Sequence, residues 1–142
     1  MNIYSQTYQP DFSESVMEAK ILYVEDNPQN MRLVRKILSN QGYAMLEAVD
    51  GMSCLRLLEQ ERPDLILMDL NLPDIDGLEV TTRIKANPQI ADIPVIALTA
   101  NAMHGDRERC LEAGCSGYIP KPLTKSELVN TVAYFLKHVR QE

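Results

Sequence analysis

The chain lacks the cysteine and histidine patterns that mark disulfide-rich proteins and zinc sites. Its three cysteines, Cys54, Cys110 and Cys115, are odd in number and form neither a CxxC pair nor a pairing with histidine. A disulfide framework or a zinc site is therefore not expected. Free thiols fit a reducing cytoplasm best, so we expect a cytoplasmic protein.

Clusters of basic residues are also absent from the sequence. The chain has 14 Lys and Arg against 20 Asp and Glu, which gives a formal net charge of -6. Proteins that bind nucleic acids neutralise backbone phosphates with grouped Lys and Arg. We therefore expect no nucleic-acid partner.

The N-terminal stretch has no basic residue before Lys20 and no long apolar run. It is therefore predicted to be neither a signal peptide nor a membrane span, and no membrane partner is expected. Residues 1–18 are polar and show no sustained period, so we expect a flexible N-terminal extension. A docking segment that uses Tyr4 and Tyr8 is the alternative. Residues 19–142 have the size of one ordinary domain.

From Lys20 onward, short apolar runs alternate with helical patterns, which is typical of βα units. The predicted strands are Ile21–Val24, Tyr43–Val49, Leu65–Met68, Val95–Leu98 and a short one around Tyr118–Ile119. The first two predicted helices run from Asn27-Pro28 to Gly42 and from Asp50-Gly51 to Arg62-Pro63. The third passes through Leu78–Ile84, the fourth is centred on Asp106–Ala113 and ends at Gly114, and the last follows the capping-box sequence Thr124–Glu127. Right-handed crossovers would place helices on both faces of the sheet. The expected fold is flavodoxin-like α/β, a (βα)5 doubly wound parallel sheet with strand order 2-1-3-4-5.

Polar side chains follow four of these apolar runs directly. They are Glu25 and Asp26, Asp69, Thr99 and Lys121. In an open parallel sheet, ligands bind where the strands have their carboxyl ends. Three carboxylates at one edge repel each other unless a cation neutralises them, and an oxygen-rich site of this kind suits Mg²⁺. For Glu25 and Asp26 alone, helix capping is the competing interpretation.

Asp69 ends a fully apolar strand, where a carboxylate can be both metal ligand and nucleophile, as in enzymes that form an aspartyl phosphate. Phosphoryl transfer needs charge neutralisation on the phosphoryl oxygens, which an ammonium group and a hydroxyl can supply. Lys121 and Thr99 have these groups, although each alone is more often a solvated lysine or a strand-end hydroxyl. Lys121-Pro122 is an X-Pro bond in a predicted tight turn, the setting in which cis peptides occur.

These residues resemble the receiver domain of bacterial two-component response regulators, the CheY-like family, over roughly residues 20–140. The resemblance lies in the segments LYVEDN, DLILMDLNLPDIDGLEV, VIALTAN and YIPKPL. It implies that Asp69 is phosphorylated by a sensor histidine kinase or a histidine phosphotransfer protein. It also implies a bound Mg²⁺, with Mn²⁺ as an alternative, held by Glu25, Asp26, Asp69 and the backbone carbonyl of Asn71. Thr99 and Lys121 would bind the phosphoryl group.

The same resemblance assigns further roles. Tyr118 sits where the family has its switch aromatic, which would fill the space that Thr99 vacates; a half-buried ring with no such role is the alternative. Asn71 and Asn101 sit where the family tunes dephosphorylation, and their uncharged side chains predict intermediate persistence of the phosphoryl group. Met103 and His104 lie in the loop that would move, and a lone loop histidine is usually solvated.

No linker or output module follows the last predicted helix, so we expect this regulator to act by binding another protein. The target would contact the face formed by the fourth helix, fifth strand and fifth helix, and the protein would be a monomer or a phosphorylation-dependent dimer. The chain also resembles single-domain regulators of the DivK type and receivers of hybrid histidine kinases. An adaptor, a phosphate relay and a phosphate sink all fit.

Two rival functions compete with this interpretation. A phosphatase of the haloacid dehalogenase type uses a similar Asp, hydroxyl and Lys, but needs a second Asp where this chain has Asn71. We therefore expect a signalling switch rather than an enzyme with turnover. A receiver-like interaction module that no longer takes phosphate would have lost an acid, the threonine or the lysine, and all are present.

Overall fold

The computed structural model describes residues 18–101 and 105–140, so residues 1–17 of the predicted extension lie outside the described part. Within it, five strands and five helices alternate along the chain. They are β2 (Lys20–Val24), α2 (Pro28–Ser39), β3 (Ala44–Ala48), α3 (Gly51–Leu57), β4 (Leu65–Asp69), α4 (Gly77–Lys85), β5 (Val95–Thr99), α5 (Asp106–Ala113), β6 (Gly117–Pro120) and α6 (Lys125–Arg140).

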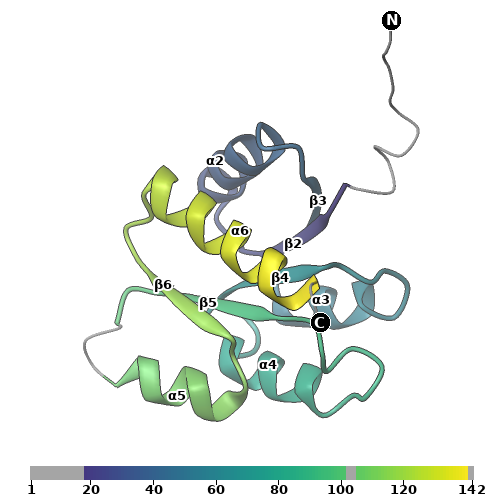
Figure 1. The fold of residues 1–142 in the computed structure, drawn as a ribbon. Helices are drawn as coiled ribbons and strands as arrows, with labels where there is room; N and C mark the ends of the chain where they lie inside the picture. Colours follow the sequence, from purple (N-terminus) through teal and green to yellow (C-terminus); the bar gives the residue numbers. More distant parts are fainter. Residues whose placement is uncertain (1–17, 102–104, 141–142) are drawn as a thin grey trace, which may run out of the picture.

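The five strands form one parallel sheet in the order β3-β2-β4-β5-β6 (Figure 1). Numbered by their appearance in the chain, this is the order 2-1-3-4-5. The predicted flavodoxin-like fold is therefore confirmed. The switch point of this topology lies between β2 and β4, where the strand order reverses and ligand sites form at the carboxyl ends.

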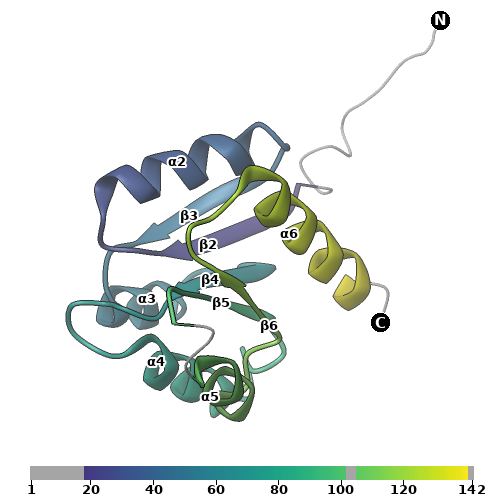
Figure 2. The same ribbon diagram turned by 90° about the vertical axis from the view of Figure 1, so that its left-hand side faces the viewer.

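Helices cover both faces of the sheet, with α2 and α6 on one side and α3, α4 and α5 on the other (Figures 1 and 2). The central strand β4 contributes to both cores in alternation. Leu65 and Leu67 pack in the cluster with α2 and α6, whereas Ile66 and Met68 pack in the cluster with α3, α4 and α5. All four have 0% exposure, as expected for an apolar run in a central parallel strand.

Side-chain caps fix where α2 and α6 begin. The Asn27 carboxamide oxygen accepts from the N–H groups of Gln29 (2.9 Å) and Asn30 (3.0 Å), and Pro28 takes the first helical position, as predicted. Before α6, the Thr124 hydroxyl accepts from the N–H of Glu127 at 3.2 Å. These caps start α2 after β2 and α6 after β6.

Two boundaries differ from the sequence-based expectation. Helix α3 ends at Leu57, not at Arg62-Pro63, because Glu59 and Gln60 bond to the carbonyls three residues before them and tighten the chain into a turn. Asp69 and Thr99 are the last residues of β4 and β5 instead of the first residues after them. Their backbones still pair in the ladder, opposite Leu98 and Pro120 respectively.

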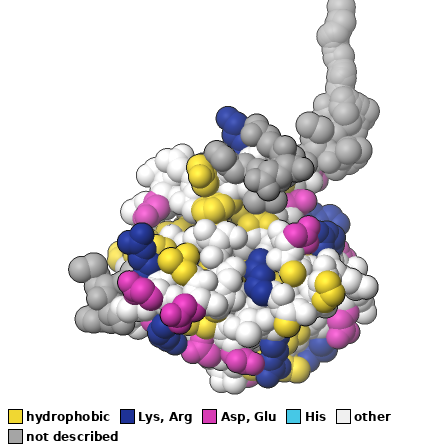
Figure 3. All heavy atoms as spheres, turned by 60° about the horizontal axis from the view of Figure 1, so that its bottom comes forward, with side chains coloured by type: hydrophobic (Ala, Val, Ile, Leu, Met, Phe, Trp, Pro, Cys, Tyr) yellow, Lys and Arg dark blue, Asp and Glu magenta, His cyan; other side chains and the backbone are white. Residues whose placement is uncertain are grey.

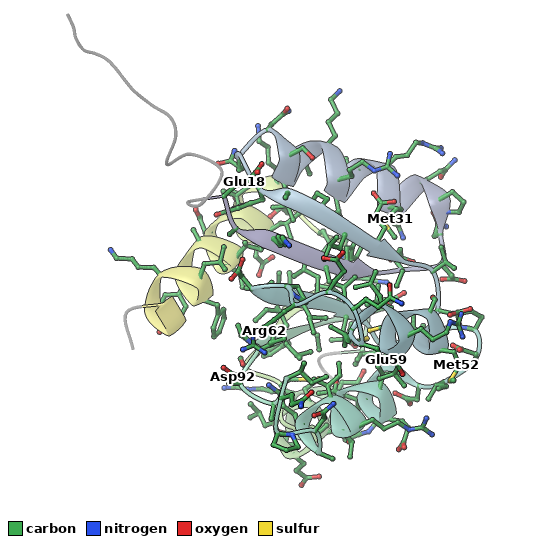
Figure 4. The ribbon with its side chains drawn as sticks, turned by 90° about the vertical axis from the view of Figure 1, so that its right-hand side faces the viewer. Glu18, Met31, Met52, Glu59, Arg62 and Asp92 are labelled. Carbon is green, nitrogen blue, oxygen red and sulfur yellow. The ribbon has the colours of Figure 1, made fainter. Side chains whose placement is uncertain are left out.

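An ion pair between Arg62 and Asp92 links two connections at the amino ends of the strands. Arg62 donates to both carboxylate oxygens of Asp92 at 2.8 Å and to the Gln89 carbonyl at 2.6 Å, which ties the start of β4 to the connection before β5. Arg62 and Asp92 lie together at one end of the molecule, and Met52 of α3 lies at the other (Figure 4).

The surface on the α4 and α5 side has acidic and basic side chains interspersed (Figure 3). Two ion pairs contribute to it, between Arg83 and Glu79 at 3.1 Å and between Arg109 and Asp76 at 3.7 Å. Among the helices that the structure describes, none combines the length and the apolar character needed to cross a membrane.

Candidate functional site

Three carboxylates gather at the carboxyl edge of the sheet, at the switch point between β2 and β4. One oxygen from each of Glu25, Asp26 and Asp69 lies within 4.8 Å of the others. The sheet brings them together because β2 pairs with β4 up to Val24 opposite Met68, so both strands end at the same level. Glu25 and Asp69 are each 2% exposed, whereas Asp26 faces solvent.

Glu25 is held in place by its own strand. The Tyr23 hydroxyl donates to Glu25 Oε1 at 2.8 Å, and the Asn27 N–H donates to Oε2 at 3.1 Å. Burial raises the pKa of the Glu25 carboxyl, the charge of Asp69 adds to that rise, and the two hydrogen bonds oppose it. Burial also raises the pKa of Tyr23, so its hydroxyl keeps the proton that it donates.

The role of Tyr23 was missed in the sequence analysis. Residues i and i+2 of a strand share a face, which allows the Tyr23 hydroxyl to reach Glu25. The only sequence signal is a tyrosine in an otherwise aliphatic strand, two residues before an acid.

Lys121 reaches Asp69 from the other side of the cluster. Its Nζ lies 2.9 Å from Asp69 Oδ1, and the Asn71 N–H donates to the same oxygen at 3.3 Å. The Lys121 N–H also donates to the Thr99 carbonyl at 2.8 Å, which anchors the lysine to the end of β5. The Lys121–Pro122 peptide bond is cis.

The loop after Asp69 is fixed by a glycine and an acid. A Cβ on Gly77 would lie 2.4 Å from the Asp69 carbonyl oxygen, so only glycine allows α4 to start this close to the site. Asp74 accepts from the N–H groups of Gly51 (2.8 Å) and Met52 (2.9 Å), which joins the loop to the start of α3. These bonds lower the pKa of Asp74.

Thr99 lies at the end of β5 and is 1% exposed, but its hydroxyl is directed to a residue that the sequence analysis missed. Its Oγ1 donates to Asp106 Oδ2 at 2.6 Å and accepts from the Asn101 N–H at 2.9 Å. Asp106, the first residue of α5, is 6% exposed. The structure therefore places Thr99 at the predicted edge of the sheet, where its hydroxyl donates a hydrogen bond to Asp106.

Tyr118 is half-buried in β6, where it pairs with Ala97, and its ring packs against the core on the α3, α4 and α5 side. The Arg107 guanidinium lies 5.9 Å from the ring centroid. Asn71 and Asn101 are both exposed at the site edge. Met103 and His104 lie outside the described residues.

The donor set fits a hard divalent cation. Three carboxylates supply oxygen ligands within a small space, two of them buried and Asp26 open to solvent, so that waters can complete the coordination. Burying Glu25 and Asp69 side by side is costly without a compensating positive charge. The acidic cluster is therefore suited to Mg²⁺.

Comparisons with known proteins agree with this geometry. The sequence model of the family described as "Response regulator receiver domain" matches residues 21–133. The polar-differentiation response regulator DivK of Brucella anthropi is 42% identical over 120 residues, which span 84% of this chain and 98% of that protein.

Solved structures give the same result. The receiver domain of a sensor histidine kinase from Pseudomonas aeruginosa, solved with a magnesium ion in its active-site cleft, matches with a TM-score of 0.79 and 41% identity, over 84% of this chain and 98% of that one. The chemotaxis response regulator CheY4 of Vibrio cholerae matches with a TM-score of 0.79 and 26% identity, over 82% and 98% respectively. This chain belongs to the response regulator receiver domain family.

Proposed function

We propose that Asp69 is the phosphoacceptor of a signalling switch, and that a sensor histidine kinase or a histidine phosphotransfer protein supplies the phosphoryl group. The observation that carries this proposal is the placement of the Asp69 carboxylate between two further acids and the Lys121 ammonium, 2.9 Å away. Phosphoryl transfer to a carboxylate nucleophile depends on positive charge that stabilises the oxygens of the incoming phosphoryl group.

Glu25, Asp26, Asp69 and the Asn71 carbonyl would hold Mg²⁺, and the same oxygen ligands would accept Mn²⁺. When bound, the ion neutralises charge on the phosphoryl oxygens. The Tyr23 hydroxyl keeps the Glu25 carboxylate oriented toward Asp26 and Asp69.

The reaction follows from the groups at the edge. An Asp69 carboxylate oxygen attacks phosphorus as the bond from phosphorus to the donor nitrogen breaks, and the donor histidine leaves with the electron pair. Lys121 and Thr99 then donate to the phosphoryl oxygens of the acyl phosphate. Water later cleaves the acyl phosphate, at a rate that the exposed side chains of Asn71 and Asn101 influence. The protein is thus a switch that is phosphorylated and reset, without a turnover substrate of its own.

The state of Asp69 would be read on the face formed by α5, β6 and α6. Tyr118 lies on β6 in this face, and the two helices of the face carry exposed side chains, Leu111 on α5 (55% exposed) and Tyr134 on α6 (53%). Apolar side chains of this kind are typical of protein interfaces. A downstream target or a second copy of the chain would bind there, whether the protein is an adaptor, a relay or a sink.

The test is incubation with acetyl phosphate and Mg²⁺ followed by intact-mass measurement. The wild type should gain one phosphoryl group, and Asp69→Asn should gain none. Asp64→Asn is the matched control. Asp64 lies directly before β4, at the opposite end of the strand from Asp69. A folded wild type without adduct would support the interaction module, and an adduct on Asp69→Asn would show that another residue is the nucleophile. Turnover of a phosphomonoester, abolished by Asp69→Asn, would support the phosphatase.

A further inference from the structure

The Thr99 hydroxyl has one proton, and the structure shows where it goes. Oγ1 donates to Asp106 Oδ2 at 2.6 Å, in a setting where Thr99 and Asp106 are 1% and 6% exposed. A hydroxyl donates one hydrogen bond at a time. Thr99 therefore cannot donate to a phosphoryl group on Asp69 while it donates to Asp106.

Asp106 is itself held from the opposite side. Arg109, one turn further along α5, donates to Asp106 Oδ1 at 2.5 Å and lies 3.7 Å from Asp76 Oδ2. Asp76 caps α4, where its Oδ1 accepts from the Leu78 N–H at 2.7 Å. The carboxylate that accepts the hydrogen bond from Thr99 is thus linked through Arg109 to the loop that follows Asp69.

The same turn of α5 also contacts the second switch residue. Arg107 follows Asp106 directly, and its guanidinium lies 5.9 Å from the centre of the Tyr118 ring. Thr99 and Tyr118 lie on neighbouring strands, β5 and β6. The first turn of α5 therefore contacts both Thr99 and Tyr118, the two residues that would move in the proposed switch.

We propose that Asp106 is a positioning residue that holds the switch in its unphosphorylated conformation by accepting a hydrogen bond from the Thr99 hydroxyl. This inference rests on the proposed function, because the competitor of Asp106 is a phosphoryl group on Asp69. Phosphorylation offers Thr99 a second anionic acceptor, and the balance between the two acceptors sets the fraction of protein in each conformation. The strength of the Asp106 hydrogen bond thereby sets how readily the protein switches.

Removing Asp106 should shift this balance toward the phosphorylated conformation. A hydrogen bond to a buried charged group contributes enough to change an equilibrium roughly tenfold or more. Asp106→Ala should therefore bind a phosphoryl analogue about tenfold more tightly than the wild type, and Asp106→Asn, a neutral acceptor, should lie between the two. Glu108→Ala is the matched control, because Glu108 is an exposed acid in the same first turn.

The experiment is a double-mutant cycle in the full chain, with beryllofluoride and Mg²⁺ as the probe and calorimetry or NMR titration as the readout. Affinity is measured for the wild type, Asp106→Ala, Thr99→Val and the double variant, after thermal unfolding has shown that each is folded. In the Thr99→Val background, where no hydroxyl remains to be shared, the Asp106 substitution should change affinity by less than about twofold. A merely structural role of Asp106 would change affinity equally in both backgrounds, and that result would overturn the inference.

A structure of the wild type with bound beryllofluoride tests the inference without any substitution. Thr99 Oγ1 should then lie within hydrogen-bond distance of the analogue. Its distance to the Asp106 carboxylate should be too long for a hydrogen bond. An unbroken Thr99–Asp106 bond in that complex would refute the inference while leaving Asp69 as phosphoacceptor. Failure of the wild type to bind the probe would overturn the proposed function, and this inference with it.

Discussion

Lys121 Nζ lies 2.9 Å from Asp69 Oδ1, although 52 residues separate them and β5 lies between their two strands. The lysine reaches across the end of β5, where its own N–H is bonded to the Thr99 carbonyl. Its side chain is 23% exposed and that of Asp69 only 3%. A half-buried cation is therefore held against a carboxylate that two neighbouring acids would otherwise repel.

Lys121→Met should slow the phosphorylation of Asp69 by acetyl phosphate by about 10²-fold, the usual cost of removing one donor to a developing anion. Quenched samples analysed by intact mass give the rate. Lys125→Met removes an exposed lysine at the start of α6 and should leave the rate unchanged. Equal rates for wild type and Lys121→Met would show that Lys121 does not assist the transfer.

Magnesium should stabilise the wild type by about 2.7 kcal/mol at a concentration one hundred times its Kd, because it binds the folded state alone. Asp26→Asn should lose most of this gain, since it removes the solvent-facing carboxylate of the cluster. Thermal unfolding with and without Mg²⁺ measures the difference. Glu59→Gln, an exposed acid in the turn after α3 (Figure 4), should respond to Mg²⁺ as the wild type does. An undiminished response in Asp26→Asn would exclude it from the metal site.

Glu25→Gln should be more stable than the wild type at pH 7 in the absence of divalent ions, by about 0.5–2 kcal/mol, a common gain from relieving unfavourable charge. Burial raises the pKa of Glu25 in the folded protein, so the folded state binds this proton more tightly than the unfolded state. The stability from protonated Glu25 is complete below the unfolded pKa of about 4.3 and is lost as pH rises through the raised pKa. The advantage of Gln should therefore shrink toward acid.

Urea unfolding in EDTA between pH 4 and pH 7 measures this difference, with Glu59→Gln as the control for an exposed acid. A stability difference that stays constant with pH, or grows toward acid, would contradict the raised pKa.

Asn101→Arg and Asn71→Lys should each change the lifetime of the acyl phosphate, by up to about 10²-fold, because hydrolysis needs a water aligned with the bond that breaks. Both asparagines are exposed beside Asp69 and Thr99, and the Asn101 N–H donates to the Thr99 hydroxyl. Decay of the adduct, followed by mass, gives the lifetime. Asn40→Arg, at the end of α2, should leave it unchanged.

Features that depend on neighbouring residues were predictable from the sequence. Helix α5 ends before Gly114 as predicted, because this glycine stops it with a φ of 102°. The cluster of Glu25, Asp26 and Asp69 was predictable as well, since parallel strands with right-handed crossovers end at one edge.

Features that depend on the direction of a side chain could not be predicted from the sequence. The helix pattern places Asp106 at the start of α5, but nothing in the sequence indicates that its carboxylate turns back to Thr99 in place of solvent. The direction of the Asp106 side chain depends on the angle between α5 and β5, and tertiary packing sets that angle. Likewise, the start of α3 is held by Asp74, which accepts from the Gly51 N–H and comes from a loop 23 residues further along the chain, so neighbouring residues give no sign of this contact.

A cleft of about 210 Å³ lies beside Lys121, between α2 and the start of the segment after β6. Its lining includes Leu33, which is 52% exposed, and Pro122. We expect the protein that donates the phosphoryl group to insert an apolar side chain into this cleft, because the cleft opens beside Lys121. Leu111 has a similar exposed fraction and belongs to α5, one of the elements of the proposed output face.

Leu33→Asp should therefore slow transfer from a phosphorylated histidine kinase by about tenfold or more, the effect of losing a central interface residue, while phosphorylation by acetyl phosphate stays normal. The kinase is chosen by profiling purified candidates for the fastest transfer. Leu111→Asp, with the same change of polarity, should leave both reactions unchanged, because donor and target would bind different faces. Equal losses with protein donor and acetyl phosphate in Leu33→Asp would mean that the substitution damages the site itself, and equal effects of Leu33→Asp and Leu111→Asp would place the donor elsewhere.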